Sequence, residues 1–244
     1  MQKSEYANLF ANEDRHFYYR ATHELLLMLI RRYTKPNAKL SLLDAGCGTG
    51  LFGMKLARFG TVMGIDISPQ AIQYAKKRAF SATHGSIEQL PFPDGSFDVV
   101  TCVDVLYHRR VTHDTQALRE FYRVLKPHGM LVLRVPAISW MKTYYDEVVH
   151  TRHRYDRMEL QKLLVWSGFH IKKLSYVNIV LLPFALISHI RYKLIPSTLS
   201  HSATSLLPSV INFLLYALLI IENRMLTFIN LPIGLGLVAV VKRE

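Results

Sequence analysis

The sequence predicts a doubly wound α/β fold, in which helices cover both faces of a mostly parallel sheet. Short apolar segments typical of buried strands alternate along the chain with segments that carry helix start and stop signals. A glycine-rich turn follows the first apolar segment, as expected where a strand leads into a helix. The length of 244 residues is enough for one elaborated domain with a full core.

Apolar runs and turn residues place the individual elements. The predicted strands are 40–44, 61–66, 97–103, 130–135, 169–176 and 235–241. The predicted helices between them are 51–59, 69–78, 115–125 and 156–167. Ser68 and Pro69 suit a helix start, and Gly168 suits a helix end.

Three parts of the chain are expected to differ in role. Residues 1–36 precede the first strand as lid helices, residues 37–177 with 231–244 form the core, and residues 178–230 form a hydrophobic helical insertion before the last strand. Residues 1–173 hold 25 basic and 16 acidic residues. Between residues 174 and 240 only Arg191, Lys193, Glu222 and Arg224 carry charge.

The insertion contains an uninterrupted apolar run at 210–221. This run is shorter than the ~20 residues that span a bilayer, so we expect no spanning helix. A buried helix pair, an element lying in the membrane interface and a homodimer interface all fit the composition.

Overall composition excludes several classes of protein. A net charge of +12 occurs together with 50% hydrophobic residues, which excludes a disordered polycationic tail. The two cysteines, Cys47 and Cys102, exclude a disulfide-rich scaffold and a cysteine-built zinc site. The first residues contain no apolar signal-peptide core, so we expect a cytoplasmic protein, with contact at the inner membrane face as the further expectation.

The turn after the first strand has the pattern of a nucleotide site. Its sequence, Asp44-Ala45-Gly46-Cys47-Gly48-Thr49-Gly50, has glycines at alternate positions, which lets the backbone approach a ligand closely. It is not the dinucleotide fingerprint G-x-G-x-x-G, because position 51 is leucine. Asp66 ends the second predicted strand, where a carboxylate can accept hydrogen bonds from ribose hydroxyls.

Two further motifs follow the glycine turn and Asp66 along the chain: L-P-F-P-D-G-S-F-D at 90–98 and L-K-P-H-G at 125–129. Over roughly residues 38–136 the chain resembles the class I S-adenosylmethionine-dependent methyltransferases, in the branch with D-x-G-C-G-T-G. The resemblance implies a seven-stranded Rossmann-like sheet and S-adenosylmethionine as cofactor. It also implies in-line methyl transfer to a small-molecule or lipid-linked acceptor, which leaves S-adenosylhomocysteine.

The resemblance implies roles for particular residues around the cofactor. The glycine turn underlies the methionine part, Asp44 lies near its ammonium group, and Asp66 holds the ribose. The implied cofactor-binding residues are Asp44, Gly46, Cys47, Gly48, Thr49, Gly50, Asp66, Ile67, Ser86, Ile87, Asp104, Tyr19 and Arg20. Tyr19 and Arg20 are included because the segment His16-Phe17-Tyr18-Tyr19-Arg20 resembles the H-F-W-F/Y-x-x-R opening of a bacterial subgroup. Ser86 stands where relatives often have an aspartate.

Three residues are candidates for catalytic roles: Tyr107, His108 and His150. His108 follows the strand that ends near residue 103, and its ordinary pKa near 6.5 suits a proton acceptor. The alternative is that His108 only shapes the pocket. We expect no metal, because His150 and His153 have no cysteine or convergent acid at ligand spacing.

A basic segment after the fifth strand is the predicted acceptor-binding site. Its residues Arg152, His153, Arg154 and Tyr155 resemble part of the signature W-S-x-H-D-x-x-x-G-H-x-R-R-Y. Asp146, Arg154 and Tyr155 match that signature, whereas Tyr145, Thr151 and His153 depart from it. Such a strip suits a phosphate or carboxylate. The alternative is a solvated loop with Asp146, Glu147 and Asp156 as ion-pair partners.

Two other functions compete with a small-molecule methyltransferase. A nucleic-acid methyltransferase would account for the positive charge, but the N/D-P-P-Y/F motif after the fourth strand and a fused RNA-binding module are not found. A non-catalytic S-adenosylmethionine-binding protein would keep the fold without turnover. The intact glycine turn and Asp66 favour the enzyme.

Overall fold

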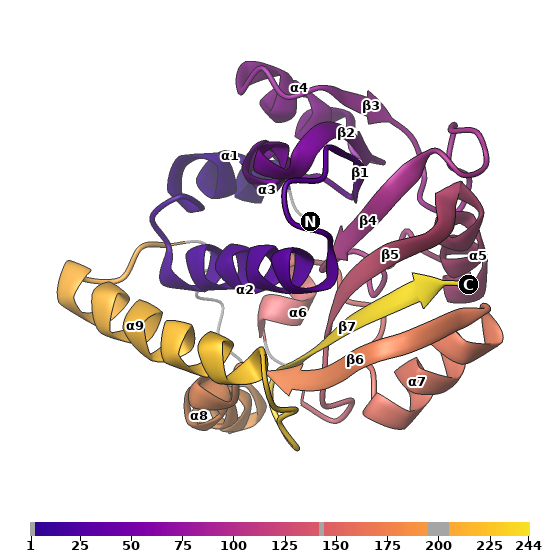
Figure 1. Ribbon diagram of the computed structural model, residues 1–244. Coiled ribbons are helices and arrows are strands. Elements are labelled where there is room, and N and C mark those ends of the chain that lie inside the picture. Colours follow the sequence, from indigo (N-terminus) through magenta and orange to yellow (C-terminus); the bar gives the residue numbers. More distant parts are fainter. Residues whose placement is uncertain (1–2, 142–143, 195–204) are drawn as a thin grey trace.

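The computed structural model describes residues 3–141, 144–194 and 205–244. Its central sheet has seven strands in the order β3-β2-β1-β4-β5-β7-β6 (Figure 1). The strands are β1 (Leu40–Ala45), β2 (Gly60–Asp66), β3 (Ala82–His84), β4 (Phe97–Val103), β5 (Leu125–Pro136), β6 (Phe169–Val177) and β7 (Gly236–Arg243). All neighbours pair in parallel except β7, which runs antiparallel to both β5 and β6.

The predicted doubly wound, mostly parallel sheet is thus confirmed. Each of the six predicted strands is present, and β3 is an additional edge strand of three residues. Strand β5 begins at Leu125 rather than at residue 130, because the L-K-P-H-G motif continues the extended backbone with only His128 at positive φ. Short edge strands such as β3 give a weak apolar pattern, which is why periodicity does not reveal it.

The helices lie on both faces of the sheet (Figure 1). They are α1 (Lys3–Asn12), α2 (Phe17–Tyr33), α3 (Leu51–Leu56), α4 (Pro69–Lys77), α5 (Asp114–Val124), α6 (Tyr144–Val148), α7 (Arg157–Trp166), α8 (Leu182–Leu194) and α9 (Ser209–Leu226), with 3₁₀ turns η1 (Ala57–Phe59) and η2 (Ile179–Leu181). Ser68 caps α4 by accepting the Ala71 N–H at 3.4 Å, and Asp156 with Glu159 forms a capping box at α7.

Successive strand residues point to opposite faces and build two cores. Leu42, Val99 and Val132 pack with α2 and with the end of α9. Leu43, Val100 and Leu131 belong to the core that includes α5 and α7. Both faces of the central strands are therefore buried, which accounts for their continuous apolar sequences.

Chain order reverses between β1 and β4, because β1 pairs with β2 on one side and with β4 on the other. In open α/β sheets this switch point opens a crevice at the carboxyl ends of the strands. The glycine turn follows β1, and Asp104 follows β4. The fold therefore brings these predicted site residues to one edge of the sheet.

Between β6 and β7, where the insertion is predicted, the structure describes η2, α8 and α9, while residues 205–208 and 227–235 are not helical. Residues 195–204 of this insertion and residues 1–2 of the lid segment lie outside the described residues. Helix α9 extends beyond the predicted apolar run at 210–221 and is 18 residues long. By length and composition alone it could cross a membrane, and only 22% of it is buried. Of the three alternatives for the insertion, the buried helix pair does not fit α9, because one side of this helix is exposed, whereas the membrane-interface element and the homodimer interface stay open.

Candidate functional site

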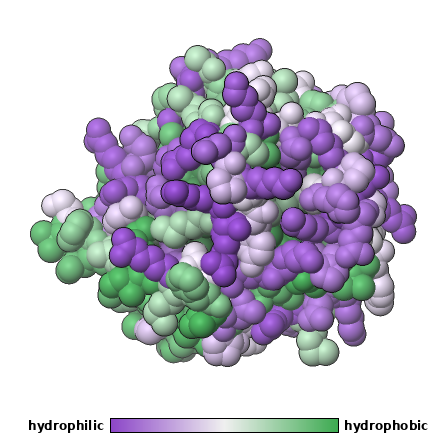
Figure 2. Space-filling view, viewed as in Figure 1, coloured by the Kyte–Doolittle hydropathy of each residue, from purple (hydrophilic) through white to green (hydrophobic). Residues whose placement is uncertain are grey.

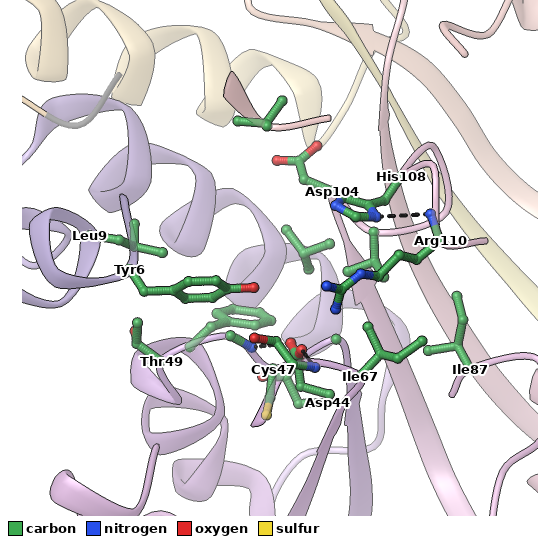
Figure 3. A pocket seen from close by; sticks show the side chains of 18 of the residues that line it. Tyr6, Leu9, Asp44, Cys47, Thr49, Ile67, Ile87, Asp104, His108 and Arg110 are labelled. Atoms are coloured by element: carbon green, nitrogen blue, oxygen red, sulfur yellow. Dashed lines mark hydrogen bonds between the residues drawn. The ribbon is translucent and has the colours of Figure 1, made fainter. Parts of the chain in front are cut away.

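A cavity of about 630 Å³ lies at the switch point. Its floor is the glycine turn after β1, its sides are the ends of β2 and β4, and α1 with α2 forms its roof (Figure 3). The predicted residues in its lining are Tyr19, Asp44, Gly46, Cys47, Gly48, Thr49, Asp66, Ile67, Ser86, Ile87, Asp104, Tyr107 and His108. We call this space the cofactor cavity.

The glycine turn holds its shape through backbone bonds and close packing. Gly46 has φ +85° and donates its N–H to the Ile65 carbonyl at 2.7 Å. A Cβ at Gly46 would come within 2.2 Å of a Val105 methyl, so only glycine fits. A Cβ at Gly48, also at positive φ, would meet no heavy atom within 4 Å, because this glycine borders the open cavity.

Gly50 belongs to the support of the turn rather than to the described lining. It is the residue before α3, with φ +85°, and a Cβ there would come within 2.9 Å of the Phe80 ring. Direct contact of Gly50 with the cofactor stays a prediction that this cavity lining does not support. Its glycine is required by the left-handed backbone and by Phe80.

Two buried carboxylates face the cofactor cavity. Asp66 accepts the Gly48 N–H at 2.9 Å and the Ser68 N–H at 2.8 Å, which fixes its orientation. Asp44 accepts the Thr101 hydroxyl at 2.9 Å through Oδ1, whereas its buried Oδ2 has no hydrogen-bond partner among the described residues. Burial raises the pKa of Asp44 to about 7.

These features fit an adenosyl ligand with a cationic amino-acid end. The unpartnered Oδ2 of Asp44 can accept an ammonium group. Each Asp66 oxygen keeps a lone pair for a ribose hydroxyl. Ile67 is 38% exposed although it is apolar, and together with Ile87 it gives the cavity an apolar end suited to a flat base.

The N-terminal helices contribute residues that the sequence did not indicate: Tyr6, Leu9 and Glu13. The Tyr6 ring lies across the cofactor cavity above the glycine turn (Figure 3). Glu13 accepts hydrogen bonds from the Thr49 hydroxyl and, at 2.8 Å, from Arg78. Burial raises the pKa of Glu13 to about 7. These hydrogen bonds connect the N-terminal lid to the glycine turn. They join residues far apart in the sequence, so no local sequence pattern predicts them.

A second cavity of about 590 Å³ adjoins the first. The two share three lining residues, Tyr19, Asp104 and Tyr107. The apolar part of the second wall includes Phe17, Met141, Ala185, Leu207 and Leu235, of which Ala185 and Leu207 come from the insertion. We call this space the acceptor cavity.

Buried ion pairs form the polar part of the acceptor cavity. Arg134, whose side chain is 3% exposed, pairs with Asp104. Arg154 makes a two-point contact with Asp146, with Nε and Nη2 at 2.9 and 3.0 Å, and donates to the Ala137 carbonyl. Such planar pairs fix both partners in position. Asp104 therefore occupies the junction of the cavities while serving as the partner of Arg134.

His108 lines the cofactor cavity, but its geometry does not favour a proton acceptor. Its Nδ1 accepts the Arg110 N–H at 3.1 Å (Figure 3). The neutral ring then carries its proton on Nε2, which can donate but not accept. Burial lowers the pKa of His108 to about 3, so the ring is neutral at ordinary pH. The alternative role, shaping the pocket and donating a hydrogen bond, fits this arrangement better.

Several predicted residues lie outside both cavities as described. His150 lines neither cavity and approaches His108 only as a neighbouring ring, with centroids 5.8 Å apart. Arg20 has its guanidinium over the Tyr216 ring at 4.0 Å, so its predicted contact with the cofactor carboxylate is corrected. On a helix, Arg20 points away from the side on which Tyr19 faces the cavities.

The prediction that the basic segment forms one cationic binding surface is also corrected, because its side chains pair with different acidic residues. Arg152 pairs with Asp114, and His153 contacts Glu159 at 2.8 Å. Tyr155 is fully buried and donates its hydroxyl to Asp114. Of the four predicted acceptor-binding residues, Arg154 alone lines one of the described cavities.

Comparison with known proteins agrees with this geometry. Residues 43–133 match the family described as a methyltransferase domain. The mitochondrial ubiquinone biosynthesis O-methyltransferase of Schizosaccharomyces pombe is 40% identical over 102 residues, covering 38% of this chain and 36% of that protein. The ubiquinone biosynthesis O-methyltransferase of Xanthomonas oryzae pv. oryzae is 32% identical over 143 residues, covering 51% and 59%. The chain thus matches these relatives over only part of their length.

Solved structures agree over nearly the whole chain. An S-adenosylmethionine-dependent methyltransferase from Thermotoga maritima has a TM-score of 0.60 at 20% identity, covering 99% of this chain and 95% of that one. Phosphoethanolamine N-methyltransferase 2 of Haemonchus contortus, solved with S-adenosyl-L-methionine, has a TM-score of 0.60 at 17% identity, covering 90% and 52%. At this identity the likeness concerns the fold. By sequence, residues 43–133 match the methyltransferase-domain family, and the fold around them is the Rossmann-like fold of S-adenosylmethionine-dependent methyltransferases.

Proposed function

We propose that this protein transfers the methyl group of S-adenosylmethionine to a small organic molecule held in the acceptor cavity. The observation that carries the proposal is the junction of the two cavities at Tyr19, Asp104 and Tyr107. A donor bound over the glycine turn and an acceptor bound among the ion pairs would meet there. Methyl transfer requires this arrangement, because the acceptor atom must approach the methyl carbon in line at about 3 Å.

The protein groups at the junction position the reactants and limit water. When bound, S-adenosylmethionine supplies a methyl group on its sulfonium and leaves as S-adenosylhomocysteine. Tyr107 is 6% exposed and Asp104 is fixed by Arg134, so the junction is rigid. Because His108 presents an N–H rather than a lone pair, a proton leaving the acceptor goes to another group or to water.

The acceptor class follows from the lining of the acceptor cavity. Arg134 and Arg154 are each paired with a carboxylate, so this wall is polar without a large net charge. The insertion contributes both polar and apolar side chains to the wall: Asn178, Ala185, Ser188, Ser205 and Leu207. The apolar part of the cavity is made by Phe17, Met141, Leu207 and Leu235. We therefore propose an amphipathic acceptor, with its reacting polar end towards Asp104 and its apolar part against Met141, Leu207 and Leu235. Relatives named for ubiquinone biosynthesis and for demethylmenaquinone support an acceptor of mixed polarity.

Calorimetry with S-adenosylmethionine tests the first step. We expect micromolar binding by the wild-type chain and severe weakening by Asp66→Asn, which keeps the shape of the residue but removes its charge. Binding by the wild type followed by formation of S-adenosylhomocysteine with demethylmenaquinol, the reduced and nucleophilic form of demethylmenaquinone, or with an amphipathic phenol would support methyl transfer. No binding by the folded wild-type chain would refute the proposal.

A further inference from the structure

The two helices of the insertion carry many exposed apolar side chains. On α9, residues at spacings of three and four form an outer stripe: Val210, Leu214, Leu218, Ile221 and Met225. Each of these side chains is between 46% and 68% exposed. Helix α8 adds Phe184, Ile187 and Ile190, which are also more than half exposed. Figure 2 shows apolar side chains gathered over α8 and α9, whereas hydrophilic ones cover most of the rest of this view.

The inner face of α9 is fixed to the protein by polar contacts. The Asn212 side chain accepts the Phe17 N–H and donates to the Arg15 carbonyl, both at 3.0 Å. Asn223 donates to the Ala21 carbonyl at 2.8 Å. The buried Glu222 accepts backbone N–H groups that begin the insertion, at Asn178 and Val180. These bonds would be lost if α9 left the protein, so its outer stripe can contact a bilayer only from the surface.

The exposed charges that the insertion itself contributes have one sign, although the exposed Glu147 of α6 accepts the Tyr192 hydroxyl of α8 at 2.7 Å. Residues 174–240 include four charged side chains, Arg191, Lys193, Glu222 and Arg224. Glu222 is buried, whereas the three cations are exposed. An apolar surface bordered by cations complements an anionic lipid bilayer. A symmetric contact with a second copy of this face would bring the cations of both copies to one interface without an exposed acid from either insertion, which is unfavourable.

The acceptor cavity reaches this face. Ser188 on α8 and Leu207 before α9 line the cavity and are also exposed. Trp140, beside the cavity residue Met141, is 61% exposed, and its ring contacts His189 of α8 with centroids 5.5 Å apart. The cavity therefore opens beside the apolar surface rather than on the hydrophilic side.

We propose that the α8–α9 face docks on an anionic lipid bilayer and that the acceptor cavity receives its methyl acceptor from that bilayer. The second half rests on the proposed methyl transfer, whereas the docking does not. An amphipathic acceptor could then move from lipid to cavity while its apolar part stays out of water. The reacting end of the acceptor would enter the cavity past Ser188 and Leu207 and reach Asp104.

Vesicle co-sedimentation of the full-length chain tests the docking. We expect binding to vesicles of phosphatidylcholine with phosphatidylglycerol, weaker binding to phosphatidylcholine alone, and loss of binding at high salt. Reversing two charges, Arg191→Glu with Lys193→Glu, should weaken binding more than about tenfold. Leu214→Ser with Ile221→Ser on the outer stripe should do the same, whereas Met158→Ser, an exposed apolar residue on α7, should not.

The two tryptophans of the chain report which face meets the lipid. Trp166→Phe leaves Trp140 beside α8, and Trp140→Phe leaves Trp166 on α7. Brominated lipids in the anionic vesicles should quench Trp140 several-fold more than Trp166. Equal quenching, or stronger quenching of Trp166, would overturn the proposed orientation.

Other outcomes would overturn the docking itself. The first is that both double variants still bind the vesicles as the wild type does. The second is that the wild-type chain binds S-adenosylmethionine normally but does not bind the vesicles. A concentration-dependent dimer that Leu214→Ser with Ile221→Ser dissociates, without vesicle binding, would assign the face to a second copy. Cofactor calorimetry on each variant separates these results from failure of the proposed methyl transfer.

Discussion

Protonation of Asp44 is predicted to control how tightly the cofactor cavity holds a cation. The side chain is 3% exposed, and its Oδ2 has no hydrogen-bond partner among the described residues. Burial raises its pKa to about 7, more than the hydrogen bond from Thr101 lowers it. The ammonium group of S-adenosylmethionine would stabilise the ionised carboxylate. Affinity should therefore increase as the pH rises and Asp44 loses its proton.

The size of this effect follows from the pKa. With a pKa of about 7, roughly a tenth of the unliganded chain has Asp44 ionised at about pH 6, and roughly nine-tenths at about pH 8. If the ligand cation binds the ionised form, affinity rises about tenfold over this interval, which is about 1.4 kcal/mol. Below the lower pH the affinity should fall by a further factor of about ten for each pH unit.

Titration calorimetry of the wild type and Asp44→Asn over this pH interval measures the effect. The asparagine keeps the Thr101 contact but cannot ionise. The ratio of the two affinities removes the titration of the ligand amino group and of Glu13, whose pKa is also raised to about 7 by burial. A ratio that stays constant with pH would refute the reasoning, because Asp44 would then not be the titrating group that meets the cation.

The same carboxylate should make the unliganded chain less stable at higher pH. The folded pKa of about 7 lies above the ordinary value of 3.8, so the folded state holds the proton more tightly. Its contribution to stability is complete below about pH 4 and is lost as the pH rises through about 7, at a cost of roughly 4 kcal/mol. In urea unfolding the loss over this pH interval should be larger in the wild type than in Asp44→Asn by this amount, because Glu13 titrates in both chains.

Three further substitutions test the site. Gly46→Ala should abolish cofactor binding in calorimetry, because its Cβ would overlap a Val105 methyl at 2.2 Å and the backbone has φ +85°; normal affinity would contradict the assigned turn geometry. Arg154→Met should lower stability in urea unfolding by about 3 kcal/mol, because it removes the cation that pairs with the buried Asp146 carboxylate, whereas a small loss would mean that solvent reaches Asp146. Arg20→Ala should keep cofactor affinity within about twofold, since its guanidinium lies over an aromatic ring of α9, and a tenfold loss would restore its predicted cofactor role.

The features predicted from the sequence are those that local chemistry determines. Strand, glycine turn and helix follow one another within a few residues, so the cradle around Gly48 could be predicted from its spacing. Asp66 at the end of the next strand could be predicted because neighbouring parallel strands end at the same edge. The helix cap at Ser68 could also be predicted, because the capping hydrogen bond joins residues that lie within one four-residue segment.

The features that could not be predicted depend on pairings across the fold. Whether Arg152 serves a substrate or Asp114 depends on a residue 38 positions away. Likewise Glu13 becomes a site residue only because it meets Thr49, 36 positions away. The basic segment shows no charge pattern that distinguishes a ligand site from a set of local ion pairs. Only the tertiary contacts show that Arg154 turns inwards while Arg152 turns to α5.

Helix α2 connects the insertion to the cofactor cavity, and this decides how membrane contact must be tested. Tyr19 and His23 face the cavity from one side of the helix, while the Phe17 amide and the Ala21 carbonyl bond to α9. A helix moves as one unit, so removal of α9 would expose the back of α2 and disturb the roof of the cavity. Deletion of 178–230 would therefore remove vesicle binding and cofactor binding together. Substitutions on the outer stripe separate the two, because those side chains contribute little to the contact with α2.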